Sequence, residues 1–202
     1  MTLSSMKSET MVWHSPHDAT ITLRQSAKCL KKESKANSFE LRRTTNLKPK
    51  VYIETSVPSY LTAWRSRDLV VAGNQETTKE WWKRRNDFEL YISEFVLQEA
   101  SNGDSKAAEN RLKSLDGIPE IEITEEVAAI AEKLLFEASL PNKARVDALH
   151  IATAAIGGMD YLLTWNCAHI ANPAFRYKIE SVIRSFGYEP PIICTPQELL
   201  EV

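Results

Sequence analysis

The sequence has little glycine, little cysteine and no long apolar run, and each scarcity argues against a class of protein. Its six glycines form neither a GxGxxG pattern nor a Walker-type loop, which weighs against a nucleotide-binding protein or a phosphatase. Its three cysteines, Cys29, Cys167 and Cys194, have no CxxC spacing, so neither a disulfide framework nor a zinc site is indicated. No stretch approaches the ~18 apolar residues of a membrane helix, and the N-terminal residues lack the apolar segment of a signal peptide. We therefore expect a soluble, cytoplasmic protein that does not enter a membrane.

The net charge of -2 conceals two segments of opposite charge. Residues 1–50 contain ten Lys and Arg against four Asp and Glu, whereas the remainder contains 15 basic and 23 acidic residues. The first segment shows no sustained apolar periodicity, which is typical of a disordered extension, although a basic arm could also contact a polyanion. We therefore predict a basic, disordered extension over 1–50 and one folded domain over 51–202.

From Val51 onward, short apolar segments alternate with helical patterns. Strands are predicted over 51–54, 88–93, 118–123, 160–164 and 191–195. Helices are predicted over 56–64, 68–87, 94–101, 104–117, 124–139, 141–156, 173–186 and 196–202, with Thr124 as an N-cap and Gly117 as a left-handed C-cap. Short apolar strands separated by helices indicate an α/β fold with a mostly parallel sheet that is covered on both faces.

Three carboxylates and one amide occur at positions where packing alone would favour apolar side chains. Glu54 ends the first predicted strand, and Asn166 lies just beyond the fourth. Glu99 and Asp147 lie on predicted helices among small or apolar neighbours. Because parallel sheets bind ligands beyond the carboxyl ends of their strands, these residues could meet at that edge. Carboxylates that meet repel one another unless a cation compensates, and oxygen ligands favour Mg²⁺ or Mn²⁺. We therefore predict a metal-dependent enzyme whose ligands are Glu54, Glu99 and Asp147, with a metal suited to phosphodiester hydrolysis.

Three neighbouring residues leave alternatives open. The Ser56 hydroxyl could hold the Glu54 carboxylate or a metal-bound water, and it could also cap the next helix. Glu94 is the alternative to Glu99 as the second metal ligand, but the two lie about 140° apart around a helix, so one helix cannot direct both at the same point. An acid in the first turn, such as Glu94, is already accounted for by its favourable interaction with the helix dipole. We therefore prefer Glu99. His150 lies on a largely apolar helix, where a histidine is more often part of the core or a support for a ligand than a catalytic group.

Aromatic and basic residues offer two further candidate surfaces. Trp81 and Trp82 precede the basic run 83–85, which could form a stacking surface for RNA. The favoured interpretation places one Trp in the core and the charges on a solvated helix face. Arg65 and Arg67, in the loop after the first strand, are better candidates for phosphate contacts.

Taken together, four segments resemble the PIN-domain ribonucleases, and most closely the VapC-like toxins of bacterial type II toxin-antitoxin systems. The segments are YIETSVPSYL, SEFVLQEA, DALHIATA and LLTWNCAHI. The resemblance implies a three-layer α/β/α sandwich, a divalent metal and cleavage of single-stranded RNA. It also implies a homodimer that a cognate antitoxin protein neutralises.

The resemblance assigns the family's first acid to Glu54, its nearby hydroxyl to Ser56, and its second and third acids to Glu99 and Asp147. Two positions depart from the family pattern. The first acid is usually Asp, so Glu54 carries its carboxylate one methylene further out, and the fourth acid is replaced by the neutral Asn166.

Two functions of different classes follow from this sequence. The first is a Mg²⁺- or Mn²⁺-dependent endoribonuclease that cleaves single-stranded or looped RNA, because the acidic domain disfavours tight nonspecific duplex binding. The second is a catalytically weak PIN-like module that binds RNA or a protein. Convergence of the acids within metal-bridging reach would favour the enzyme.

Overall fold

The computed structural model describes residues 47–138 and 140–201, and these form a layered α/β domain. The strands are β1 (Lys50–Ile53), β2 (Glu89–Ser93), β3 (Glu120–Ile121), β4 (Tyr161–Leu163) and β5 (Ile192–Cys194). The helices are α2 (Ser56–Thr62), α3 (Leu69–Lys83), α4 (Glu94–Ala100), α5 (Ser105–Leu115), α6 (Glu125–Glu137), α7 (Arg145–Ile156), α8 (Pro173–Ser185) and α9 (Pro196–Leu200). Most of the predicted extension, residues 1–46, lies outside the described residues, and the division at Lys50 stays a prediction.

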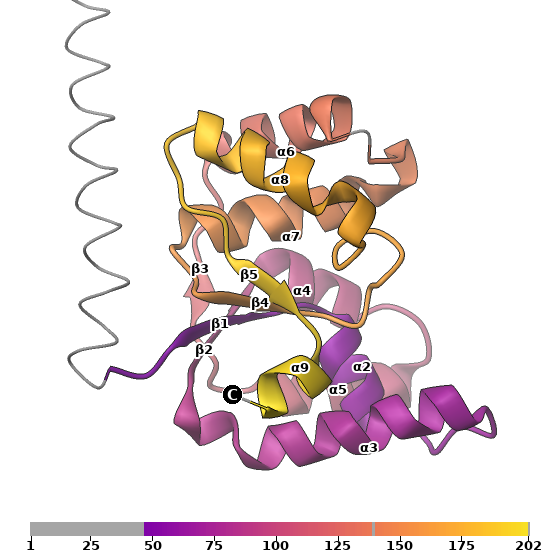
Figure 1. Cartoon of the computed structure of the whole chain (residues 1–202). Helices are drawn as coiled ribbons and strands as arrows, with labels where there is room; N and C mark the ends of the chain where they lie inside the picture. The colour runs from indigo at the N-terminus through magenta and orange to yellow at the C-terminus, as the bar shows by residue number, and fades with distance from the viewer. Residues whose placement is uncertain (1–46, 139, 202) are drawn as a thin grey trace, which may run out of the picture.

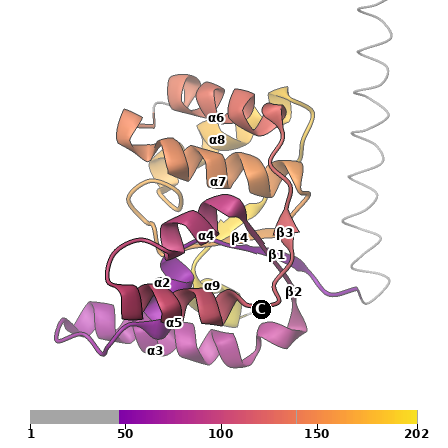
Figure 2. The same ribbon diagram turned by 180° about the vertical axis from the view of Figure 1, so that it is seen from behind.

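The sheet confirms the predicted α/β/α sandwich. Its strand order is β3-β2-β1-β4-β5, and every neighbouring pair runs parallel. Helices α6, α7 and α8 lie on one side of the sheet, and α2, α3, α5 and α9 lie on the other (Figure 1). Seen from behind, α4 lies between α7 and α5 (Figure 2). Because both faces are covered, the central strand β1 is buried after its first residue, Lys50, with Val51, Tyr52 and Ile53 fully buried.

Several elements are shorter than predicted, among them the helix predicted over 68–87 and strand β3. The helix predicted over 68–87 ends at Lys83 and is followed by a 3₁₀ turn over Arg85–Asp87, which brings the Phe88 ring against the core ring of Trp81. Strand β3 has two residues instead of six. It is an edge strand, and Pro119 just before it has no N–H to donate to a ladder.

The predicted caps have different outcomes. Gly117 follows α5 with φ +75°, so the predicted left-handed C-cap is confirmed. Thr124 does occupy the N-cap of α6, but its side chain makes no capping hydrogen bond there. Two acids, Glu125 and Glu126, stand in the first turn of that helix, where they favour its dipole.

Helix α7 ends where it approaches the edge strand closely. A Cβ atom on Gly157 would lie 2.8 Å from Ile121 Cδ1, so a larger residue would force β3 and α7 apart or displace the Ile121 side chain. Within the described part of the chain, none of the helices has both the length and the apolar character needed to span a bilayer.

Candidate metal centre

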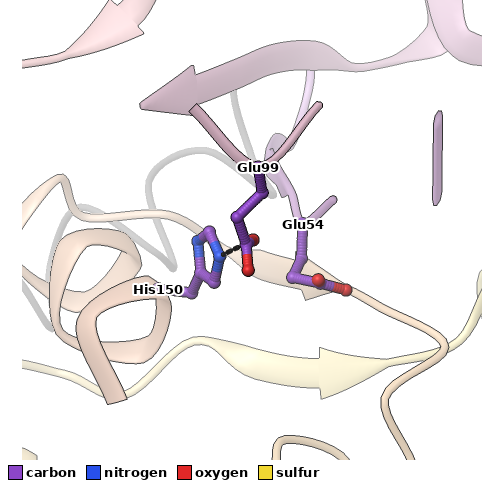
Figure 3. Close-up of side chains that lie close together, drawn as sticks. All are labelled: Glu54, Glu99 and His150. Atoms are coloured by element: carbon purple, nitrogen blue, oxygen red, sulfur yellow. Dashed lines mark hydrogen bonds and ion pairs between the residues drawn. The ribbon is translucent and has the colours of Figure 1, made fainter. Parts of the chain in front are cut away.

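The polar side chains of the candidate site gather where strands β1, β2 and β4 end. Glu54 directly follows β1, Thr164 directly follows β4, and α4 begins immediately after β2. Because the strands are parallel, these three points lie along one edge of the sheet. The side chains of Glu54 and Glu99 approach one another there, with the His150 imidazole beside Glu99 (Figure 3).

The Glu54 carboxylate is held by three donors. Its Oε1 accepts the Ser56 backbone N–H at 3.1 Å, and its Oε2 accepts the Thr164 hydroxyl at 2.6 Å. The Ser56 hydroxyl also donates to Oε2 and accepts the backbone N–H of Trp165 at 2.7 Å. Ser56 is the first residue of α2, and the N-cap is Thr55. Of the two roles that the sequence left open for Ser56, the geometry therefore shows the contact with Glu54.

The Glu99 carboxylate is held through one oxygen. Its Oε2 accepts the Thr55 hydroxyl at 2.6 Å and lies 2.9 Å from His150 Nε2, whereas none of the described residues donates to Oε1. Glu54, Glu99 and His150 each offer an atom such that these atoms lie within 4.8 Å of one another. Two carboxylates at this spacing fit a divalent cation, since Mg²⁺ and Mn²⁺ take carboxylate ligands, and the imidazole lies beside them with Nε2 against Glu99.

His150 is buried behind the site and belongs to a longer hydrogen-bonded chain. Its Nδ1 lies 2.8 Å from the Tyr52 hydroxyl, which in turn lies 2.6 Å from Ser93 Oγ. All three side chains have no solvent exposure. Burial raises the pKa of Tyr52, so its hydroxyl stays protonated. The sequence favoured either a core role or a supporting role for His150. In the structure His150 has both roles, because it is buried in the core and contacts Glu99.

The surroundings of Glu99 favour its ionised form. Its burial alone would raise the pKa, but the hydrogen bonds from His150 and Thr55 lower the pKa below its ordinary value of 4.5. A carboxylate that remains ionised can bind a cation without first losing a proton.

This lowered pKa predicts a loss of stability in acid. A group whose pKa is lower in the folded state contributes stability above its unfolded pKa, and that contribution disappears as the pH falls through the folded pKa. In chelator-treated protein, the wild type should lose more free energy of unfolding between about pH 7 and about pH 3 than Glu99→Gln. Urea unfolding at both pH values measures this difference, and parallel losses in the two proteins would contradict it.

Asp147 lies in a second cluster with Asn166 and His169. Its Oδ1 accepts the Asn166 amide N–H at 2.9 Å, and its Oδ2 lies 2.8 Å from His169 Nδ1. Asn166 also accepts the His169 backbone N–H at 3.1 Å, so both ends of its amide are used. Among the described residues, Asp147 is not part of the group that lies within 4.8 Å. Its assignment as a metal ligand stays a prediction.

The two clusters are linked through one threonine. The Thr164 hydroxyl donates to Glu54 and accepts the backbone N–H of Asn166 at 2.8 Å. The neutral Asn166 therefore suits its place, because an aspartate there could not donate to Asp147 and would repel it. The geometry gives Asn166 the role of holding Asp147, and a catalytic role for it remains a prediction.

The other predicted candidates lie apart from this network. Glu94 is exposed and accepts a hydrogen bond from Gln98, in agreement with the preference for Glu99. Arg65 and Arg67 are exposed in the loop between α2 and α3, and their phosphate contacts stay a prediction. Trp81 is fully buried, which agrees with the interpretation of one core tryptophan.

Sequence reasoning missed Thr55, Thr164 and His169. Thr55 and Thr164 directly flank predicted site residues or strand ends, so the rule that ligand sites lie at carboxyl ends of strands could have found them. His169 had a weaker signal, namely its position three residues after Asn166 in the same loop.

Comparison with known families agrees with this architecture. The PIN domain family matches residues 51–166, and the chain belongs to that family. Comparison with curated proteins gave no match. PIN domains are generally metal-dependent nucleases, so membership and the Glu54–Glu99–His150 group together indicate a nuclease fold with a candidate metal site.

Proposed function

We propose that this protein is a Mg²⁺- or Mn²⁺-dependent endoribonuclease that cleaves single-stranded or looped RNA. The observation that carries the proposal is the approach of Glu54 and Glu99 to within 4.8 Å, with His150, at the carboxyl edge of a PIN-domain sheet. A binding module without activity would have no need to hold two carboxylates so close together, because their repulsion opposes folding unless a cation compensates.

In this proposal Glu54 and Glu99 hold the metal and the surrounding residues orient them. Ser56 and Thr164 fix the Glu54 carboxylate, and Thr55 and His150 fix Oε2 of Glu99, so that Oε1, which has no donor among the described residues, would be available to a cation. A bound Mg²⁺ or Mn²⁺ would activate water and neutralise charge on the phosphodiester. Addition of water at phosphorus with departure of the 3′-oxygen would leave a 5′-phosphate and a 3′-hydroxyl.

Asp147 and His169, which are linked to Glu54 through Asn166 and Thr164, also take part in the proposed site. The Asp147 carboxylate orients the His169 imidazole, whose side chain is 20% exposed and has no second hydrogen bond among the described residues. The preference for single-stranded RNA is supported by the acidic charge of residues 51–202, which disfavours nonspecific duplex binding. Action as a toxin, neutralisation by an antitoxin and homodimer formation belong to the same proposal.

Cleavage of a mixed single-stranded RNA pool tests the proposal. Purified protein is incubated with Mn²⁺, with Mg²⁺ or with EDTA, beside an Asp147→Asn variant. We expect cutting that requires the metal and is strongly reduced in the variant, because the neutral amide that replaces the carboxylate would no longer orient His169 in the same way. Well-folded protein that binds the RNA without cutting it, under all metal conditions, would instead support the binding module.

A further inference from the structure

Two helix-capping positions near Glu99 carry hydroxyls that do not cap. Ser93 is the N-cap of α4 and Thr55 is the N-cap of α2, yet neither side chain makes a capping hydrogen bond. Elsewhere in the described chain, the side chains of Asp68, Asp104, Asn172 and Thr195 do accept backbone N–H groups at the starts of helices α3, α5, α8 and α9, whereas that of Thr124 at the start of α6 does not. A capping hydroxyl typically contributes ~1 kcal/mol to its helix. Ser93 and Thr55 do not make that contribution. Thr55 donates to Glu99 instead, and Ser93 hydrogen-bonds to Tyr52, which contacts His150.

The direction of each hydrogen bond in this network can be deduced. The Glu99 carboxylate only accepts, so His150 Nε2 must carry the hydrogen that lies between them. In the neutral imidazole, Nδ1 then accepts from the Tyr52 hydroxyl. Tyr52 has one hydrogen to give, so Ser93 donates to Tyr52. The chain runs in one direction, from Ser93 through Tyr52 and His150 to Glu99.

We infer that the chain Ser93–Tyr52–His150, together with Thr55, positions Glu99 as a one-oxygen metal ligand and thereby sets the metal affinity of the site. Both donors converge on Oε2, so Oε1 is left for the cation. His150 is a positioning residue in this inference, because its Nε2 hydrogen is committed to Glu99. The inference rests on the proposed metal site and adds the residues that govern its affinity.

Removal of the Tyr52 hydroxyl tests the inference with a change of one oxygen atom. Residues that support metal ligands from behind typically change metal affinity by about 10- to 100-fold when replaced. We expect Tyr52→Phe to weaken Mn²⁺ binding by at least about tenfold in calorimetry and in paramagnetic resonance of free Mn²⁺. Tyr188→Phe is the matched control, because its hydroxyl also donates to a carboxylate, Glu126, at 2.7 Å, and it should leave the affinity unchanged.

The outcomes separate this inference from the proposed function. Wild-type protein that binds neither Mn²⁺ nor Mg²⁺ would overturn both. Wild-type binding that Tyr52→Phe leaves unchanged would overturn the positioning role alone. If Tyr52→Phe does not unfold cooperatively and is therefore misfolded, Thr55→Val is tested in its place. This variant removes the Thr55 hydroxyl, which donates to Glu99 Oε2 alongside His150.

Nitrogen-15 NMR of labelled histidine gives a readout that does not depend on activity. We expect a hydrogen on Nε2 of His150 in the metal-free protein and after addition of Mg²⁺. A hydrogen on Nδ1 alone would overturn the inference, because Nε2 could then not donate to Glu99. Loss of the Nε2 hydrogen when Mg²⁺ binds would also overturn it, because His150 would then bind the metal itself.

Discussion

Replacement of Glu54 by Gln should reduce kcat/KM for metal-dependent RNA cleavage by about a thousandfold, since a catalytic metal contributes several kcal/mol and each tenfold in rate corresponds to about 1.4 kcal/mol. Glu54 is only 6% exposed, and its carboxylate is already held by Ser56 and Thr164. Gln keeps the shape of the side chain but removes the charge that attracts the cation. Initial rates over a range of RNA concentrations, at saturating Mn²⁺ for the wild type, measure the loss.

Glu94→Gln is the matched control for this prediction. Glu94 lies on α4, as Glu99 does, but it is exposed and contacts only Gln98 among the hydrogen-bonding groups described. The control should cleave RNA at the wild-type rate. Equal activity of Glu54→Gln and Glu94→Gln would show that the cluster at the sheet edge does not perform the reaction.

Trp81→Ala should destabilise the domain by about 3–5 kcal/mol, the usual cost of removing a large aromatic side chain from a core. Trp81 has no solvent exposure, and its ring packs near Trp82 and Phe88. The indole Nε1 has no hydrogen-bond partner within the described structure, so the loss is one of packing and apolar burial. Urea unfolding of the two proteins, followed by circular dichroism, measures the difference.

Trp82→Ala provides the comparison for the core prediction. Trp82 is only partly buried, and the Arg85 guanidinium lies 5.4 Å from its ring centroid. Its replacement should cost clearly less than that of Trp81. If Trp81→Ala kept the wild-type stability and lost RNA binding, the aromatic and basic segment would be an RNA surface after all.

The sequence was sufficient for the fold because the strands are apolar and short. Strands buried on both faces appear as runs such as VYI, and the alternation of these runs with helices determines a parallel sheet. The edge strand β3 was overestimated because IPEIEI has an alternating pattern, whereas pairing there depends on Pro119 and on a single neighbouring strand.

The candidate site was only partly predictable, for a geometric reason. Strand ends can be located from sequence, which is why Glu54 and the segment around Asn166 were found. Which atoms then meet depends on helix orientation. The sequence does not show that His150 turns toward Glu99 or that Asp147 pairs with His169. Hydroxyl side chains such as Thr164 are common in any sequence, so their contact with Glu54 becomes visible only in three dimensions.

The central position of β1 has a consequence for how the protein is synthesised. β1 pairs with β4 on one side, and the Thr164 hydroxyl that holds Glu54 lies 110 residues further along the chain. At translation rates of about 5–20 residues per second, a ribosome needs roughly 5 to 20 seconds to produce that distance. During this interval one edge of β1 stays unpaired and Glu54 lacks one of its donors. A nascent chain therefore cannot complete the hydrogen bonds around Glu54 until Thr164 has been made, so the proposed nuclease would stay inactive on the ribosome throughout that interval.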